Sequence, residues 1–236
     1  ATSNQAQLVS VRSPGTPHGG VLRLREWREL FALADRHGFI IASDECYSEI
    51  YFDEASPPLG GLQAAVALGR RGFDRLVVFG SLSKRSNAPG LRSGFVAGDA
   101  TVLKSFLRYR TYHGTAMGTA FQAASAAAWR DEEHVIENRR KYAAKFRLAT
   151  PVVQQVLRTE QPEAAFYLWA RTPIGEEEFA RRLHAQYNVT VLPGSYLSRT
   201  RDGANPGHDF VRIALVAEEA EVMEAARRIA EFGRSL

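Results

Sequence analysis

The chain has 236 residues, of which 45% are hydrophobic, 24% charged and 10% aromatic, a composition that excludes wholesale disorder. No apolar run approaches the ~20 residues of a membrane helix, and the first residues lack the basic-then-apolar order of a secretory signal. The single cysteine, Cys46, excludes an internal disulfide framework and a cysteine-rich zinc site. We therefore expect a cytoplasmic enzyme or binding domain with no membrane segment and no metal.

The charges are dispersed along the chain. The 30 basic and 26 acidic residues give a formal net charge of +4 and an isoelectric point near 9.4. The densest basic cluster, over residues 139–147, follows Glu132, Glu133 and Glu137 on a helical pattern, which is typical of a solvated helix face with paired charges. We therefore expect no nucleic-acid partner.

The first predicted elements are a strand, a loop and a helix. The apolar run Leu8–Val11 predicts a short buried strand, which stops at a loop rich in proline and glycine over residues 13–20. Apolar side chains then recur at helical spacing from Trp27 to Ala34, and Gly38 supplies the C-terminal stop of this helix.

Strands and helices continue to alternate in the next hundred residues. In chain order we expect a buried strand at Phe39–Ala42, a short helix around Leu62–Leu68, a buried strand at Leu76–Phe79, a strand at Phe95–Gly98 and a helix capped by Asp99 that runs towards Tyr109. This alternation predicts an α/β layer with a mostly parallel sheet.

The second half of the chain changes character. From about Thr115 to Leu157 the pattern is helical, and Pro151 is expected to end or kink the helix. The elements expected after it are a strand at Phe166–Ala170, a helix at Glu176–Gln186, strands at Val189–Leu192 and Phe210–Leu215, and a final helix at Glu218–Phe232. We expect a large domain over residues 1–128 and a small α+β domain over residues 129–236.

Polar residues follow three of the expected strands at their carboxyl ends, where open α/β sheets bind ligands. The strand at Phe39–Ala42 leads into Ser43–Tyr47, the strand at Leu76–Phe79 into Gly80–Arg85, and the first strand into the loop at residues 13–20. Their convergence on one edge of the sheet predicts a site there.

Lys84 and Arg92 carry the most informative charges of this edge. Partial burial at a strand end favours the neutral amine of Lys84, which then can act as a Schiff-base nucleophile. Arg92 follows the tight turn at residues 89–91, and with Ser81 and Ser83 it would form an anion pocket suited to a phosphate. Spacing alone fits two ordinary surface cations equally well.

Asp44 and Tyr47 follow the neighbouring strand. A carboxylate at the end of an apolar strand needs a partner, and a protonated heterocyclic nitrogen would be one. An aspartate paired with the pyridine nitrogen is what makes pyridoxal 5′-phosphate (PLP) an electron sink, and the phenol of Tyr47 would reach the ring's O3′. Taken singly, a helix-capping aspartate and a core tyrosine explain these residues better.

Taken together, these residues form a known pattern. Two motifs lie about forty residues apart. One is Asp-x-x-Tyr, which begins at Asp44, and the other is Ser-x-x-Lys, which begins at Ser81 and is followed after seven residues by Arg92. Together they closely resemble the class I/II (fold-type I) PLP-dependent aminotransferases. Within this family, two segments are most similar to the succinyldiaminopimelate aminotransferases of lysine biosynthesis. They are Ser-Asp-Glu-Cys-Tyr-Ser-Glu-Ile-Tyr, which begins at Ser43, and Ser-Leu-Ser-Lys-Arg-Ser-Asn, which begins at Ser81. The resemblance runs along essentially the whole chain.

The resemblance implies a role for each cofactor ligand. Lys84 would bind PLP covalently and act as the acid and base of the proton shift, while Asp44 would pair with the ring nitrogen and Tyr47 with O3′. The residues implied for the phosphate are Ser81, Ser83 and Arg92.

The resemblance also extends to both ends of the chain. The segment Phe210–Leu215 matches the family's segment whose arginine holds the substrate α-carboxylate, so Arg212 is the implied substrate ligand. Thr16 stands where the family usually has the asparagine that donates to O3′, and its shorter side chain should weaken that contact or leave it to water.

Relatives are about 400 residues long, so we expect the chain to be N-terminally truncated relative to the family, with a partial large domain. The resemblance implies a homodimer and amino transfer between an amino acid and a 2-oxo acid, with N-succinyl-LL-2,6-diaminopimelate and 2-oxoglutarate as the expected pair. A truncated, non-catalytic PLP-binding module, another class I/II aminotransferase and a β-lyase are the alternatives, because fold and cofactor residues do not determine the substrate.

Overall fold

A computed structural model describes residues 6–114 and 116–236 of the chain. The chain divides into two compact units. The first unit holds the residues up to Gly15 and Gly20–Arg139, and the second holds Thr16–Gly19 and Arg140–Leu236. Within the described ranges, no helix combines the length and the hydropathy needed to cross a membrane.

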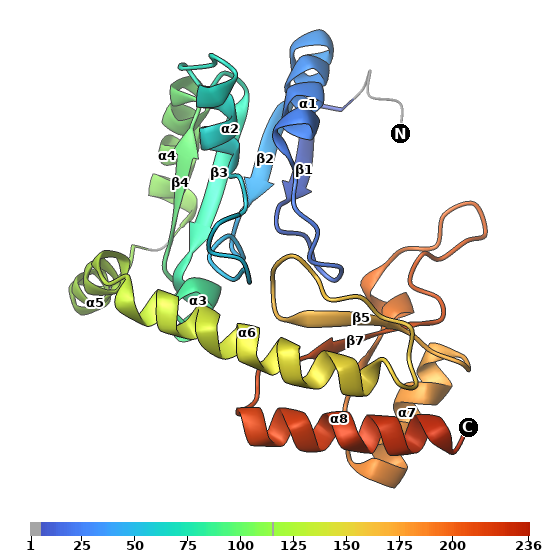
Figure 1. Ribbon diagram of the computed structural model, residues 1–236. Coiled ribbons are helices and arrows are strands. Elements are labelled where there is room, and N and C mark those ends of the chain that lie inside the picture. The colour runs from blue at the N-terminus through green and yellow to red at the C-terminus, as the bar shows by residue number, and fades with distance from the viewer. Residues whose placement is uncertain (1–5, 115) are drawn as a thin grey trace. The chain divides into compact units, whose positions relative to one another are not determined.

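A four-stranded sheet forms the centre of the first unit (Figure 1). Its strands, in spatial order, are β1 (Leu8–Arg12), β2 (Ile40–Asp44), β3 (Leu76–Ser81) and β4 (Gly94–Gly98). β1, β2 and β3 run parallel, and β4 is antiparallel to β3. The expected α/β layer with a mostly parallel sheet is therefore confirmed.

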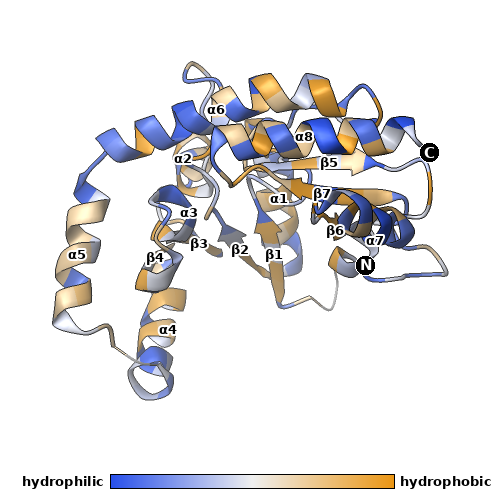
Figure 2. Cartoon of the chain, turned by 90° about the horizontal axis from the view of Figure 1, so that it is seen from below, coloured by the Kyte–Doolittle hydropathy of each residue, from blue (hydrophilic) through white to orange (hydrophobic). Residues whose placement is uncertain are grey.

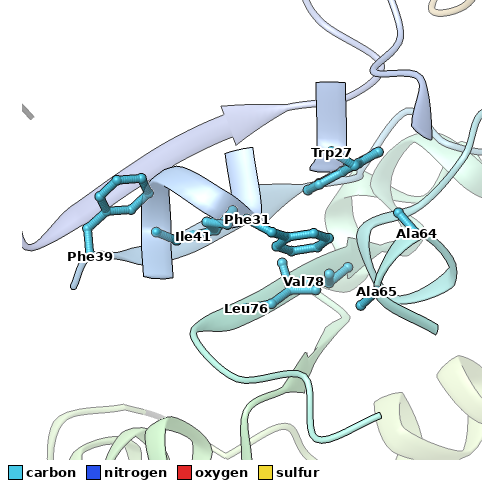
Figure 3. Packing of buried hydrophobic residues seen from close by; sticks show 9 residues of the cluster. Trp27, Phe31, Phe39, Ile41, Ala64, Ala65, Leu76 and Val78 are labelled. Atoms are coloured by element: carbon cyan, nitrogen blue, oxygen red, sulfur yellow. The ribbon is translucent and has the colours of Figure 1, made fainter. Parts of the chain in front are cut away.

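Two helices cover this sheet and bury its main apolar cluster. They are α1 (Leu24–His37) and α2 (Gly61–Ala67). Trp27 and Phe31 of α1 are at most 2% exposed and pack with Ile41, Leu76 and Val78 from the strands (Figure 3). Burial of each such side chain contributes about 1.5–3 kcal/mol, so this cluster fixes α1 on the sheet.

The predicted ends of two helices are confirmed by their capping geometry. Gly38 adopts φ 80° directly after α1, and its N–H donates to the carbonyl of Ala34 at 2.8 Å. Glycine takes this left-handed conformation without steric cost, which is why the helix stops there. Asp99 accepts hydrogen bonds from the N–H groups of Thr101 and Val102 and so begins α4 (Ala100–His113).

The expectation that the first strand is buried is wrong. β1 lies at the edge of the sheet and pairs on one side with β2, so its side chains alternate between exposed and partly buried positions. Leu8 is 58% exposed. An apolar run of four residues predicts a strand, but its burial depends on neighbours on both sides.

The long helical region is divided into two helices, α5 (Thr119–Arg130) and α6 (Glu133–Val153). Asp131 separates them, and its carboxylate accepts the N–H of Glu133 at 3.0 Å, as a helix-capping residue does. α6 ends at Val153, two residues after Pro151, as expected, whereas Thr115 lies outside the described residues. Figure 2 shows the pale orange of apolar residues along most of α5, and residues 119–124 of this helix are all exposed.

The second unit is a small antiparallel sheet with three helices. Its strands, in spatial order, are β5 (Tyr167–Arg171), β7 (Phe210–Ala214) and β6 (Leu192–Pro193). The helices are the C-terminal part of α6, α7 (Glu176–Tyr187) and α8 (Glu219–Arg234). The strand expected at Val189–Leu192 is wrong in extent, because only Leu192 and Pro193 pair with β7.

Candidate active site

The carboxyl ends of β2 and β3 lie side by side because the two strands are parallel. Asp44, the last residue of β2, is in register with Phe79 of β3, and the N–H of Glu45 donates to the Phe79 carbonyl at 2.9 Å. Asp44 and the segment that begins at Ser81 therefore leave the sheet at the same edge. The predicted convergence of these two segments is present in the structure.

The Asp44 carboxylate has two partners in the first unit. Arg12, which is in register with it on β1, donates from Nε to Oδ2 at 3.2 Å, and the N–H of Cys46 donates to Oδ1 at 3.1 Å. Both side chains of the ion pair are partly exposed, which limits its strength to about 1 kcal/mol or less. Arg12 is a partner that the sequence pattern did not indicate.

Lys84 and Tyr47 lie close together. The Lys84 amine is 5.8 Å from the centre of the Tyr47 ring, a cation–π distance, although Lys84 lies just after β3 and Tyr47 just after β2. Tyr47 is 8% exposed, whereas Lys84 is only partly buried. The amine therefore has a rigid aromatic neighbour while its own position remains accessible.

Cys46, which lies between Asp44 and Tyr47 in the sequence, has a thiol that is a poor nucleophile at neutral pH. Burial, together with the hydrogen bond and the charge of Asp44, raises the pKa of the Cys46 thiol to about 12. The thiol therefore stays protonated near pH 7, and a protonated thiol is a poor nucleophile.

Of the three residues predicted for a phosphate, the two serines contact each other, and Arg92 has a local contact of its own. The Ser81 hydroxyl accepts the N–H of Ser83 at 3.1 Å and so begins the short helix α3 (Leu82–Arg85). Its oxygen lies 2.9 Å from the Ser83 hydroxyl. Arg92 has φ 51°, is exposed, and donates to the Pro89 carbonyl at 2.9 Å. Two hydroxyls and a guanidinium of this kind suit an anion.

Glu45 is a structural carboxylate that sequence reasoning left without a role. One of its oxygens accepts from the Ser43 hydroxyl at 2.9 Å and from the N–H of Gly61 at 2.7 Å. Burial raises the pKa of Glu45, against the effect of these two hydrogen bonds. Glu45 thus ties the residues after β2 to the start of α2.

Arg212 lies in the second unit, on the central strand of its sheet. Its guanidinium is 4.2 Å from the centre of the Tyr167 ring, and it is in register with Trp169 and Leu192 on the flanking strands. Arg212 forms no ion pair with another described residue, and its guanidinium lies over an aromatic ring. This arrangement leaves the guanidinium able to bind a carboxylate.

Thr16 also belongs to the second unit by its contacts, whereas the other predicted cofactor ligands belong to the first. Gly19 explains the assignment of this segment: a Cβ there would lie 2.3 Å from the Ala164 carbonyl oxygen and 2.4 Å from Pro162. The close approach requires glycine.

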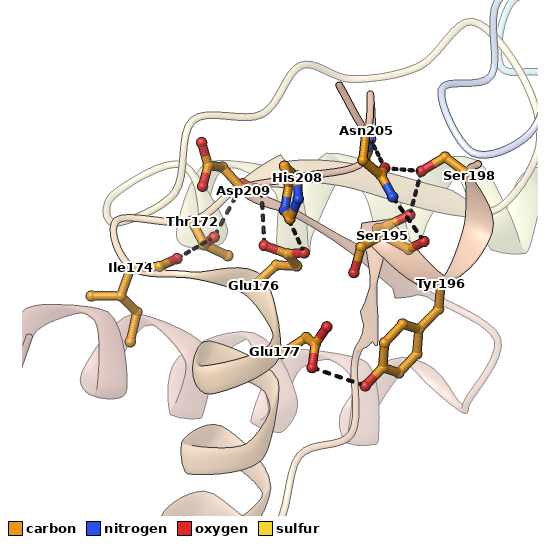
Figure 4. Close-up of polar contacts among 12 residues, drawn as sticks. Thr172, Ile174, Glu176, Glu177, Ser195, Tyr196, Ser198, Asn205, His208 and Asp209 are labelled. Atoms are coloured by element: carbon orange, nitrogen blue, oxygen red, sulfur yellow. Dashed lines mark hydrogen bonds and ion pairs between the residues drawn. The ribbon is translucent and has the colours of Figure 1, made fainter. Parts of the chain in front are cut away.

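A buried carboxylate braces the chain just before Arg212. Glu176, at the start of α7, is 3% exposed; it accepts the N–H of Asp209 at 3.0 Å and lies 3.2 Å from the His208 ring nitrogen (Figure 4). Burial acts to raise the pKa of Glu176, but the hydrogen bonds it accepts and the His208 ring outweigh burial and lower the pKa. The start of β7 is thereby fixed.

The groups of the first unit fit PLP by their chemistry. A carboxylate can hold a proton on a pyridine nitrogen, a phenol can donate to O3′, an amine can bind the aldehyde, and hydroxyls with a guanidinium can hold the phosphate. An α/β sheet with these donors at its carboxyl edge matches the class of PLP-dependent enzymes.

Comparison with known proteins identifies the family. The family model "Aminotransferase class I and II" matches residues 1–229, and the chain belongs to this family. Its members are PLP-dependent enzymes. The chain is 34% identical over 229 residues to the 4-dedimethylamino-4-oxo-anhydrotetracycline transaminase OxyQ of Streptomyces rimosus, covering 96% of the chain and 60% of that relative.

Two solved structures extend the comparison. An aminotransferase from Neisseria meningitidis is 55% identical with a TM-score of 0.92, covering 98% of this chain and 58% of that one. A probable N-succinyldiaminopimelate aminotransferase from Thermus thermophilus is 28% identical with a TM-score of 0.84, covering 97% and 59%. The chain thus spans about 60% of the length of the relatives it matches.

The Glu176 contacts generate a prediction about acid stability. Because the folded pKa of Glu176 is lowered, its stabilisation is complete above the ordinary value of 4.5 and is lost as the pH falls through the lower folded value. Glu176→Gln should reduce the free energy of unfolding by about 1–3 kcal/mol at pH 7, and by progressively less in acid. Urea unfolding of both proteins between pH 7 and pH 3 measures this difference. Glu177→Gln, at the exposed neighbour, is the control; an equal loss for both variants would contradict the prediction.

Proposed function

We propose that this protein is a PLP-dependent aminotransferase that moves an amino group from an amino acid to a 2-oxo acid. The observation that carries the proposal is the Lys84 amine 5.8 Å from the Tyr47 ring, at the strand edge where Asp44 ends β2. An amine, a phenol and a carboxylate at that edge match the three polar functions of the PLP ring.

Each residue of the first unit has a separate task in this proposal. PLP, when bound, supplies an electron sink for the electrons of the broken Cα–H bond. Asp44 holds the proton on the ring nitrogen, and Tyr47 donates a hydrogen bond to the ring oxygen. Lys84 would hold the aldehyde carbon, and its amine would move the proton of the substrate Cα. Arg92, Ser81 and Ser83 hold the phosphate.

Arg212 orients the substrate in this proposal. A guanidinium binds an α-carboxylate through two parallel N–H···O bonds, which fixes both the distance and the rotation of the amino acid. The stacking of Arg212 on Tyr167 supports this role, because it orients the guanidinium without neutralising its charge. The alternative role of a surface ion pair has no support among the described contacts.

The cofactor linkage can be tested directly. After incubation with PLP and reduction with borohydride, peptide mapping should find the label on Lys84, because reduction makes the imine bond permanent. Lys84→Ala should abolish the label, whereas Lys104→Ala, at an exposed lysine of α4, should leave it unchanged. Label elsewhere, or none, would exclude the cofactor assignment.

For the substrate we propose N-succinyl-LL-2,6-diaminopimelate as donor and 2-oxoglutarate as acceptor, and hence a place in lysine and amino-acid biosynthesis. The similarity to the Thermus thermophilus structure supports this choice. The succinylated donor should give a higher kcat/KM than aspartate or alanine, and Arg212→Gln should raise the KM of every donor by roughly 10–100-fold. Arg171→Gln, a neighbour paired with Asp209, is the control. A preference for aspartate or alanine would refute the substrate but not the transaminase.

We also propose a cytoplasmic homodimer. The exposed apolar residues of α4 and α5 support dimerisation: Leu107, Tyr112 and Phe121 are 68%, 85% and 54% exposed. Light scattering should give twice the chain mass, and Phe121→Asp should shift the protein to the monomer. Val66→Asp, at an equally exposed valine of α2, should not. A wild-type monomer, or dissociation by both variants, would contradict the proposed interface.

A further inference from the structure

The residue that follows Lys84 is a buried arginine with three contacts. Arg85 is 4% exposed; its guanidinium donates to the Ala128 carbonyl at 2.9 Å, pairs with the Glu132 carboxylate and lies 5.1 Å from the centre of the Trp129 ring. All three partners lie at the C-terminal end of α5 or in the turn that follows it. Arg85 therefore anchors α3, the helix that carries Lys84, to α5.

The two residues that follow α3 are attached to α6. The Ser86 hydroxyl lies 2.8 Å from Nε2 of His134, and the Asn87 amide donates to the Asn138 side chain at 2.8 Å. α3 has only four residues, too few to be stable by itself, so its orientation depends on contacts of this kind.

These contacts make the position of α3 costly to change. A buried guanidinium that loses its carbonyl and carboxylate partners remains charged and desolvated, which costs more than the same loss at the surface. The backbone of Lys84 is thus fixed one residue from a strongly constrained side chain. The Lys84 side chain itself is long and flexible, so a fixed backbone determines where its amine can reach.

We propose that Arg85 is a positioning residue for Lys84: its contacts with Ala128, Glu132 and Trp129 set the orientation of α3 so that the lysine amine meets the cofactor aldehyde. This inference rests on the proposed function. This role differs from a general stabilising role. Loss of Arg85 should weaken the bond between Lys84 and the cofactor and should leave the non-covalent contacts of the pocket unchanged.

Arg70 provides a matched control in the same unit. Its guanidinium pairs with the Asp35 carboxylate at 2.6 Å, donates to the Asp74 carbonyl at 3.1 Å and lies 4.9 Å from the centre of the Phe31 ring. These are the same three kinds of partner that Arg85 has, but Arg70 precedes β3, whereas Arg85 follows it. Loss of either guanidinium removes a similar set of contacts.

The test compares two ligands on the full chain. PLP can bond to Lys84, whereas pyridoxine 5′-phosphate has a hydroxymethyl group in place of the aldehyde and binds without that bond. The dissociation constant of pyridoxine 5′-phosphate divided by that of PLP measures the covalent contribution to PLP binding. Lys84→Ala, which cannot form the bond, gives the lower limit of this ratio. Dissociation constants are measured for wild type, Arg85→Gln, Arg85→Lys, Glu132→Gln and Arg70→Gln.

Arg85→Gln should lower this ratio by about tenfold or more, the equivalent of one lost hydrogen bond to a charged group, while pyridoxine 5′-phosphate binds nearly as before. Arg85→Lys, which keeps a cation for Glu132, should recover part of the ratio, and Arg70→Gln should leave it unchanged. Glu132→Gln removes an exposed partner and should lower the ratio by less, so it decides the matter if Arg85→Gln does not fold.

Two results would overturn the proposal. In the first, the Arg85 variants bind PLP and pyridoxine 5′-phosphate more weakly by the same factor, which indicates a structural role only. In the second, every Arg85 and Glu132 variant binds both ligands as wild type does. Failure of the proposed function is a different outcome: wild type itself would then bind PLP no more tightly than pyridoxine 5′-phosphate.

Discussion

The parallel pairing of β2 with β3 is the constraint on which the candidate site depends. Asp44 and Lys84 are 40 positions apart in the chain, and only the register of Asp44 with Phe79 brings their segments to one edge. The Glu45-to-Phe79 hydrogen bond extends this pairing one residue past the end of β2. A slip of one residue would turn every side chain of β2 to the opposite face, so the buried side chains of this sheet also determine which way Asp44 points.

Polar contacts then hold the segments that leave the sheet. Arg85 contacts the end of α5, and Ser86 and Asn87 contact α6. Arg139, also on α6, pairs with Glu49 and Glu54, which follow Tyr47. Each of these ion pairs joins a buried guanidinium to a carboxylate that is partly exposed. Such pairs add little net stability compared with apolar packing, but their hydrogen bonds depend on direction. The two segments of the candidate site thus both contact α6, and the Lys84 segment also contacts the end of α5; these direction-dependent contacts specify their relative position.

Local signals in the sequence account for most of the fold. Gly38 and Asp99 mark helix ends through their own backbone and side chain, and the apolar runs mark β2 and β3, so these elements are predictable. The exposure of β1 and the two-residue length of β6 depend on which strands lie beside them. The helix break at Asp131 rests on a single capping residue within a long helical pattern.

The candidate site shows the same division between local and long-range information. The motif that contains Asp44, Tyr47 and Lys84 is visible in the sequence, and the cation–π contact between Lys84 and Tyr47 is consistent with it. The partners of Arg85 lie 43 and 47 positions away, and the arginine next to a motif lysine carries no signal of them. The pairing of Arg12 with Asp44 likewise follows from strand register and not from either local sequence.

The two charges proposed to meet ionic ligands are held in different ways, and this difference has a chemical consequence. Asp44 has a carboxylate-to-guanidinium partner in Arg12, so a pyridine nitrogen must share or replace that ion pair. Arg212 is held by the ring of Tyr167, which orients the guanidinium, and it forms no ion pair with another residue that the structure describes. In the proposed function, a substrate carboxylate would therefore meet a guanidinium oriented on β7, and the Glu176 contacts with the residues before that strand brace its start.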